Sequence, residues 1–327
     1  MSKLVTIYGG SGFVGRYIVR RMAKAGWRVR VAVRRPNEAM FVKPYGVVGQ
    51  VEPVFCNIRD DASVAEVMQD ADAVVNCVGI LAESGKNSFS AVQEEGAARI
   101  ARIAAEQGIA RMVHISAIGA DADSDSAYAR TKAAGEEAVL RFIPDAVILR
   151  PSIVFGPEDQ FFNRFGAMTR MGPVLPIAAA ATWFQPVYVD DVAQAAELAL
   201  TGQAAPGVYE LGGPRVASFR ELMETMLEVV QRRRIVIGLP RWIAAIMAGV
   251  LDIVQFVSFG LLANKILTRD QLRNLGRDNV VGEGAQGLDA LGISPTAMEA
   301  VLPDYLWKFR PAGQYAELMK SSHKLRP

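Results

Sequence analysis

Short apolar runs alternate with longer amphipathic stretches along the first half of the chain. Six runs rich in β-branched residues predict strands near residues 3–8, 28–33, 51–55, 72–78, 111–116 and 145–149. A segment with helical spacing of apolar positions follows each run. This alternation is typical of a parallel sheet with helices on both faces. The pattern therefore predicts a doubly wound α/β fold.

Stop signals delimit two of the expected helices. The helix over 88–107 should end before Gly108, and the helix over 126–142 should end before Pro144. Later in the chain, Ser218 and Glu221 match a capping box and begin a further helix. We expect residues 232–234, three arginines, to lie in its last turn, where they would complement the helix dipole; a functional basic patch is the alternative.

The first strand leads directly into a glycine-rich turn, Gly9-Gly10-Ser11-Gly12-Phe13-Val14-Gly15, and then into a helix. Glycines at three-residue spacing allow a tight turn and a close backbone approach to a pyrophosphate, which the helix amino terminus attracts. We therefore expect Gly9, Ser11, Gly12, Phe13 and Val14 to bind a dinucleotide. A glycine-rich turn without a ligand is the alternative.

The end of the second strand indicates which dinucleotide is bound. NAD-binding proteins usually carry a carboxylate there for the ribose hydroxyls, whereas this chain has Arg34 and Arg35. Guanidinium groups suit a 2′-phosphate, so the sequence favours NADPH. The alternative is that these arginines are simply solvated.

The organisation changes after residue 150, where prolines and glycine–proline pairs interrupt the pattern. We expect residues 1–150 to form a Rossmann-type NAD(P)-binding domain and residues 151–327 to form a smaller carboxy-terminal lobe that covers the cofactor.

Charge and cysteine content narrow the functional classes. The 36 basic and 34 acidic residues nearly cancel, so we expect no general attraction to nucleic acid. Cys56 and Cys77 lie in apolar contexts without companion ligands, which predicts reduced core residues and no metal site. The first strand begins close to Met1, so we expect no signal or transit peptide.

The segment 235–264 is apolar and nearly uncharged, but it carries Asp252 in its middle. A central aspartate makes a membrane-spanning helix unfavourable. We expect an interfacial or partner-docking helix near 241–264 that contacts a membrane surface.

Tyr128 and Lys132 are four residues apart on an expected helix, and Ser116 ends the fifth strand. The ammonium can lower the pKa of the phenol and hold a ribose, the phenol can exchange a proton with a substrate, and the serine can orient the substrate oxygen. His114, on the same strand as Ser116, is expected to be a core residue with satisfied hydrogen bonds.

These motifs, together with residues 76–79 and 150–156, resemble the extended or atypical short-chain dehydrogenase/reductase superfamily. The resemblance covers roughly the first half of the chain. It implies that Asn57 and Ile58 flank the adenine and that Val78 and Gly79 pass the middle of the cofactor. It also implies that the segment from Pro151 to Ile153 reaches the nicotinamide.

A narrower resemblance covers nearly the whole chain. Residues 157–165, 186–193, 267–272 and 278–281 are similar to the nucleotide-binding accessory subunits of respiratory complex I. This similarity implies retained NADPH, other complex I subunits as partners, and a peripheral position on the cytoplasmic face of the energy-transducing inner membrane. It also implies that substrate turnover is not the established role.

Three functions follow from these observations. The leading hypothesis is a non-catalytic NADPH-binding accessory subunit that supports the peripheral arm of complex I. The alternative is an active NADPH-dependent reductase or epimerase in which Ser116, Tyr128 and Lys132 are catalytic. A redox sensor is a third class, which no specific feature of the sequence supports.

Overall fold

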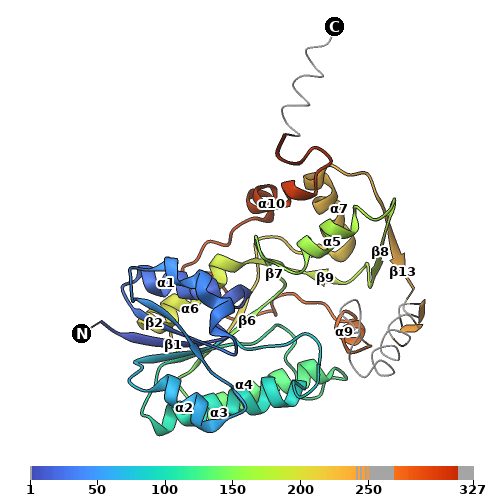
Figure 1. Cartoon of the computed structure of the whole chain (residues 1–327). Coiled ribbons are helices and arrows are strands. Elements are labelled where there is room, and N and C mark those ends of the chain that lie inside the picture. Colours follow the sequence, from blue (N-terminus) through green and yellow to red (C-terminus); the bar gives the residue numbers. More distant parts are fainter. Residues whose placement is uncertain (1, 241, 244, 247–248, 250–268, 316–327) are drawn as a thin grey trace.

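The computed structural model describes residues 2–240, 242–243, 245–246, 249 and 269–315. Its central sheet is parallel throughout, with the strand order β11-β6-β5-β4-β1-β2-β3 (Figure 1). The predicted doubly wound α/β architecture is confirmed. The strands are β1 (Leu4–Tyr8), β2 (Arg28–Val33), β3 (Val51–Phe55), β4 (Ala73–Asn76), β5 (Met112–Ile115), β6 (Val147–Pro151) and β11 (Gly207–Leu211).

The seventh strand, β11, comes from the part of the chain that we assigned to the carboxy-terminal lobe. The preceding helix α6 (Val189–Thr201) also returns to the sheet and packs against α1 (Phe13–Lys24). The sequence pattern does not predict this strand, because it lies beyond the regular alternation of strands and helices in the first half of the chain. The chain therefore leaves the central sheet after β6 and returns to it with α6 and β11, so the Rossmann-type domain and the lobe are not separated by a single boundary at residue 150.

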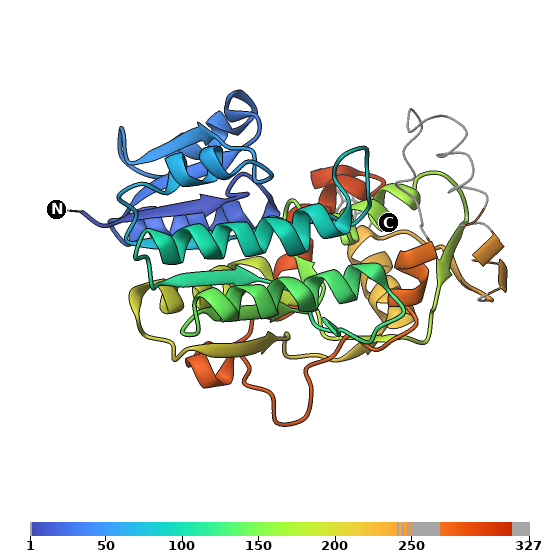
Figure 2. The same cartoon turned by 90° about the horizontal axis from the view of Figure 1, so that it is seen from below.

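Helices cover both faces of the sheet. Val5, Ile7 and Val31 point towards α1 and α6, whereas Tyr8 and Val74 belong to the core on the opposite face. That second face is covered by α2 (Asp61–Met68), α3 (Glu95–Glu106) and α4 (Ala127–Phe142). Figure 2 shows α3 and α4 side by side on the sheet. Because all strands of the central sheet are parallel, their carboxyl ends lie at the same edge.

The helix expected over 88–107 has a different geometry at its start. Residues Ser90–Glu94 form a π-helical turn, and α3 follows at Glu95. Gly135 of α4 lies so close that a Cβ atom there would be 2.2 Å from the carbonyl oxygen of Gln93. The Gln93 amide also donates to the carbonyl of Ile80 beyond β4 (2.8 Å). Apolar periodicity alone does not reveal such a turn.

The carboxy-terminal lobe has its own core, formed around Phe155, Phe162, Phe219, Leu222 and Leu302. Its elements are β7 (Val154–Phe155), α5 (Phe162–Met168), β8 (Val174–Ala178), β9 (Trp183–Phe184), β10 (Val187–Tyr188), β12 (Ala217–Ser218), α7 (Phe219–Val230), β13 (Ile235–Leu239), α9 (Arg269–Asn274) and α10 (Met298–Leu306). Single-turn or irregular 3₁₀ segments occupy Pro36–Tyr45, Asp289–Leu291, Trp307–Phe309 and Gly313–Tyr315.

The capping box of Ser218 and Glu221 is confirmed at the start of α7. The placement of residues 232–234 in the last turn of this helix is wrong. The helix ends at Val230 because Gln231 adopts a left-handed conformation with φ of 54°, and the three arginines lead into β13.

The apolar segment 235–264 is only partly described. Residues Ile235–Leu239 form a strand paired with β8, not a helix. The helix expected near 241–264 falls mostly outside the described residues. In the described part of the chain, no helix combines the length and apolar character needed to cross a membrane.

Candidate functional site: a dinucleotide cleft

The glycine-rich turn joins β1 to the first turn of α1. Gly9 adopts a positive φ of 75°, and its N–H donates to the carbonyl of Ala32 in β2 (3.0 Å). A Cβ atom on Gly15 would lie 2.5 Å from the carbonyl oxygen of Gly9, so only glycine lets helix and turn pack this closely. Gly12 is the helix N-cap and provides no capping side chain, which leaves the first helical N–H groups available to an anion.

Residues beyond β4 lie against the same turn. A Cβ atom on Gly9 would be 3.2 Å from both the Cys77 carbonyl carbon and a methyl group of Val78. The N–H of Val78 donates to the Asn76 side chain (3.0 Å), which fixes the chain as it leaves the strand. The structure therefore brings Gly9, Val78 and the neighbouring Gly79 together at the edge where nucleotides bind in such folds.

The two arginines after β2 lie at the adjacent strand end, and both are exposed. Arg35 forms an ion pair with Glu38 (3.0 Å), in which both side chains are more than two-thirds exposed. Such a pair contributes little stability and can exchange for another anion. Within the described residues, the Arg34 side chain has no hydrogen bond or ion pair. Both guanidinium groups are thus available to an anion from solution.

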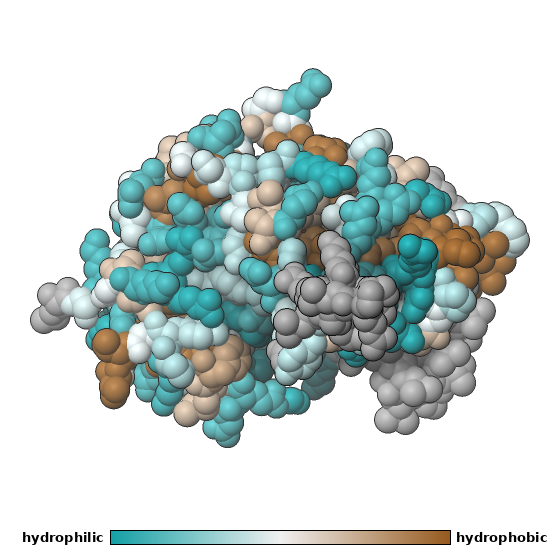
Figure 3. Space-filling model, turned by 90° about the horizontal axis from the view of Figure 1, so that it is seen from above, coloured by the Kyte–Doolittle hydropathy of each residue, from teal (hydrophilic) through white to brown (hydrophobic). Residues whose placement is uncertain are grey.

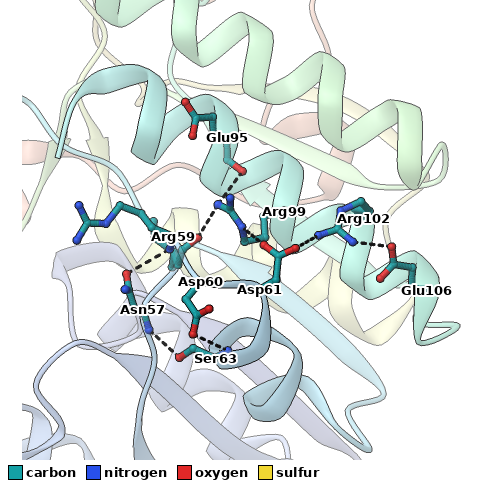
Figure 4. A network of polar contacts seen from close by, with 10 residues as sticks. Asn57, Arg59, Asp60, Asp61, Ser63, Glu95, Arg99, Arg102 and Glu106 are labelled. Carbon is teal, nitrogen blue, oxygen red and sulfur yellow. Dashed lines mark hydrogen bonds and ion pairs between the residues drawn. The ribbon is translucent and has the colours of Figure 1, made fainter. Parts of the chain in front are cut away.

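Asn57 and Ile58 follow β3 at the next strand end (Figure 4). The Asn57 N–H donates to the Ser63 hydroxyl (3.0 Å), and its side-chain oxygen accepts from the N–H of Arg59 (3.2 Å). The carbonyl of Ile58 accepts from Arg99 (2.9 Å).

Ion pairs between α2 and α3 lie next to the loop that contains Asn57 and Ile58. Asp61 of α2 pairs with both Arg99 and Arg102 of α3, and Arg102 also pairs with Glu106 (2.6 Å) (Figure 4). Contact with Arg99, and then with Arg102, lowers the pKa of Asp61. The loop expected at the adenine is therefore braced against α2 and α3.

Ser116 directs its hydroxyl towards Glu136 of α4, to which it donates a hydrogen bond. Glu136 is buried and pairs with Arg150 (2.6 Å), which in turn reaches Glu210 of β11 (3.5 Å). The Glu136 contact raises the pKa of Arg150. The role of Ser116 in orienting a substrate stays a prediction, and it would require this buried contact to rearrange.

Lys132 is buried near the ends of β4 and β5. Its ammonium group donates to the carbonyl of Ile115 (3.0 Å) and lies 3.5 Å from where a Cβ atom on Gly79 would be. Burial lowers the pKa of Lys132 to about 8, although the charges of Glu136 and Cys77 act in the opposite direction. The side chain thus connects the ends of β4 and β5 at the expected ribose position.

Tyr128 lies one helical turn before Lys132 and packs edge-to-face on Phe89, with ring centroids 5.8 Å apart. Its hydroxyl has no hydrogen-bond partner within the described residues. Burial raises the pKa of Tyr128 to about 12. The expected lowering by the ammonium group is therefore wrong for the free protein, because desolvation of the phenol dominates.

Pro151 and Ile153 lie where β6 passes into the carboxy-terminal lobe. The carbonyl of Pro151 accepts from the N–H of Ile118 (3.1 Å), and that of Ile153 accepts from the N–H of Val187 (2.9 Å). These contacts join the ends of β5 and β6 to β10. The two residues thus lie where the ends of the central strands meet the carboxy-terminal lobe.

His114 is buried, as expected, but its hydrogen bonds are only half satisfied. The Asn76 side-chain amide donates a hydrogen bond to Nδ1 of the imidazole (3.1 Å), whereas Nε2 has no hydrogen-bond partner in the described part of the chain. Burial, and then the charge of Lys132, lower the pKa of His114 to about 3. The imidazole is therefore neutral at physiological pH and unsuited to proton transfer there.

The segment 269–282, called the strap below, was not assigned to the site from the sequence. Asp270 of α9 accepts hydrogen bonds at the start of α4 from the Ser126 hydroxyl (2.9 Å) and the N–H groups of Ala127 (2.8 Å) and Tyr128 (3.2 Å). Gln271 donates to the carbonyl of Leu81 beyond β4 (3.0 Å). The strap therefore caps the helix that carries the tyrosine–lysine pair.

Further along the strap, Asn279 binds the ends of two more strands. Its side-chain oxygen accepts from the Ser152 hydroxyl (2.7 Å), and its amide donates to the carbonyl of Ile118 (3.1 Å). The N–H of Gly282 then donates to Glu210 (2.8 Å). The strap thus crosses the carboxyl ends of β4, β5, β6 and β11, the edge at which a substrate would meet the cofactor.

A model of the NAD dependent epimerase/dehydratase family matches residues 5–212. Subunit 9 of the mitochondrial NADH dehydrogenase [ubiquinone] 1 alpha subcomplex from Arabidopsis thaliana is 36% identical and covers 95% of this chain and 79% of its own. The mitochondrial 40 kDa subunit of NADH-ubiquinone oxidoreductase from Neurospora crassa is 30% identical, over 98% and 83% of the two chains. A ceramide reductase from Caulobacter vibrioides is 31% identical, over 72% and 74%.

Solved structures support the fold. The epimerase Mth375 from Methanothermobacter thermautotrophicus superimposes with a TM-score of 0.71 at 19% identity, over 98% of this chain and 95% of its own.

Proposed function

Because the chain belongs to the NAD dependent epimerase/dehydratase family, and within it to the group of subunit 9 of the NADH dehydrogenase 1 alpha subcomplex, we propose that it is a non-catalytic NADPH-binding accessory subunit of a proton-pumping NADH:quinone oxidoreductase. One observation carries the proposal: the closely packed glycine turn at the uncapped start of α1 occurs together with the strap, which hydrogen-bonds across the ends of the central strands. The cleft can hold a dinucleotide, and the strap restricts what else can reach it.

The residues of the cleft fit NADPH. The close packing of Gly9 and Gly15 lets a pyrophosphate approach the backbone, and the uncapped start of α1 offers N–H donors. Arg34 has no partner in the described part of the chain, and Arg35 has only an exposed one. A 2′-phosphate beside the glycine turn would give both guanidinium groups an anion to bind.

Two features of the nucleotide-free structure support a non-catalytic role. The Ser116 hydroxyl is committed to the buried Glu136, which is itself paired with Arg150. The Tyr128 phenol has a raised pKa and lies on a helix that Asp270 of the strap caps. A nucleotide held in this way acts as a structural ligand. If only the folded state binds it, an excess of a thousandfold over the Kd stabilises the fold by about 4 kcal/mol.

The names of the relatives describe subunits of the mitochondrial NADH dehydrogenase, and they support a proposal about partners and location. We propose that this chain binds other subunits of the same complex. It would lie peripherally on the cytoplasmic face of the energy-transducing membrane, with the segment 241–264 at the membrane surface.

A second candidate is an NADPH-dependent reductase or epimerase. The buried Lys132, one helical turn from Tyr128, donates to the carbonyl of Ile115, and this arrangement supports the second candidate. A ceramide reductase is also among the relatives. Tyr128→Phe should then abolish hydride transfer to a carbonyl substrate while NADPH stays bound. The absence of NADPH oxidation by the wild-type protein across a broad panel of carbonyl compounds would exclude this candidate.

The main proposal is tested by reversing the charges of Arg34 and Arg35. The double variant to glutamate should lose bound NADPH and melt at the temperature of the nucleotide-free protein. A matched control reverses Lys24 and Arg28, which are exposed near the start of β2 and away from the cleft. Equal NADPH content in both purified double variants would contradict the proposed site.

A further inference from the structure

The small sheet of β8 and β13 is apolar on both of its faces. Leu175, Ile177 and Val236 point into the core of the carboxy-terminal lobe. In the parallel register, Ile235 pairs with Val174 and Ile237 with Pro176, and these four residues are exposed. Ile235 is 64% exposed, and Met171 in the turn before β8 is 86% exposed. The outward-facing positions of a solvent-exposed strand are ordinarily polar. An outer face made of apolar residues is therefore suited to burial against another surface.

Only basic charges accompany this face in the sequence. Residues 160–189 and 229–251, the two stretches that contain the strands, include no aspartate or glutamate. Arg170 and residues 232–234 lie beside the strands. The side chains of Arg232 and Arg234 are anchored on the carbonyls of Phe309 (2.7 Å) and Thr169 (2.8 Å), not on carboxylates.

Within the described residues, none of these four arginines forms an ion pair. Arg233 is exposed, and its guanidinium group has no hydrogen bond there. Glu224 and Glu228, on α7, line the same hollow as residues 232–234 and Ile235, but neither forms an ion pair with these arginines. Figure 3 shows hydrophobic residues gathered at the end of the molecule where β8 and β13 lie in Figure 1.

We propose that the outer face of β8 and β13, together with its arginines, docks on a lipid bilayer surface that contains anionic lipids. Exposed aliphatic side chains bordered by arginines that form no ion pair within the described residues match an interfacial surface. The aliphatic side chains would enter the headgroup region, and the guanidinium groups would meet lipid phosphates. This face is separate from the dinucleotide cleft. It also differs from the segment 241–264, so the inference does not depend on the nucleotide.

The test is a flotation assay of the full-length protein with vesicles of phosphatidylcholine, or of phosphatidylcholine mixed with phosphatidylglycerol. The wild type should bind the mixed vesicles more tightly, and added salt should reduce this difference. Arg233→Ala should weaken binding to mixed vesicles by about fivefold. Ile235→Ser with Ile237→Ser should weaken binding to both kinds of vesicle. All three side chains are exposed, so the fold should tolerate the changes.

The control is Val47→Ser with Val48→Ser, which removes two exposed apolar side chains from the Rossmann-type domain. This variant should bind vesicles like the wild type. Equal binding of the wild type to both vesicles, or unchanged binding of the β13 variants, would overturn the proposal. The proposal would also be overturned if the wild type did not bind vesicles while the β13 variants failed to assemble into the NADH:quinone oxidoreductase, because the face would then bind a protein. NADPH content is measured in parallel, so failure here leaves the proposed function separately testable.

Discussion

Removal of the Asp270 carboxylate should loosen the start of α4. In the structure this single group accepts three hydrogen bonds, from the Ser126 hydroxyl and from the N–H groups of Ala127 and Tyr128. Loss of a helix cap costs about 1 kcal/mol, and loss of a negative charge at a helix amino terminus costs up to about 1 kcal/mol more. We therefore expect Asp270→Ala to make local opening of this helix end easier by about 2 kcal/mol.

Hydrogen exchange measures this opening directly. A change of about 2 kcal/mol corresponds to roughly thirtyfold faster exchange of the Ala127 and Tyr128 amides. The control is Asp125→Ala, because Asp125 is exposed nearby and its side chain forms no hydrogen bond or ion pair within the described residues. If both variants exchange at the wild-type rate, the strap does not hold the helix, and the argument that it restricts access to the cleft is refuted.

Three further predictions concern the same cleft. Because burial lowers the pKa of Lys132 from 10.5 to about 8, the folded chain releases a proton in this window that the unfolded chain keeps. As the pH rises from about 8 to 10.5, the free energy of unfolding of the nucleotide-free wild type should increase by about 3 kcal/mol relative to that of Lys132→Met, as measured in urea. A difference between the two proteins that stays constant with pH would argue against a buried ammonium group. The pKa of His114 is lowered from 6.5 to about 3, so the folded state loses stability as the pH falls between these values. His114→Gln should unfold with about one proton less uptake there, and identical pH slopes would show that the imidazole does not titrate on unfolding. Gly15→Ala should destabilise the protein by about 1–3 kcal/mol through its clash with the Gly9 carbonyl. Gly172→Ala meets no atom within 4 Å and should melt like the wild type in calorimetry, whereas equal melting of both variants would contradict the close packing of the turn.

The parts of the site that sequence predicts are local. The glycine spacing and the four-residue step from Tyr128 to Lys132 each lie within one turn or one helix, so the pattern identifies them directly. The contacts that decide their chemistry are not local. Asp270 is 142 residues away from Tyr128. Ser116 donates to Glu136, which is buried and pairs with Arg150.

Similar limits apply to the fold. The six strands predicted in the first half alternate regularly with helices and are confirmed. Strand β11 lies beyond that alternation, and the pattern does not predict it. The capping box at Ser218 predicts where α7 begins, but its end depends on the backbone conformation of Gln231. Neither a glycine nor a proline marks that position, so the sequence offers no stop signal before the arginines.

The central claim is that the chain is a nucleotide-retaining subunit of a respiratory complex. We would purify the tagged full-length protein from gently solubilised membranes, identify co-purifying proteins by mass spectrometry and quantify bound nicotinamide by fluorescence. We expect subunits of the NADH:quinone oxidoreductase and about one retained NADPH per chain. A partner-free protein that exchanges its nucleotide freely would contradict the account and favour the reductase.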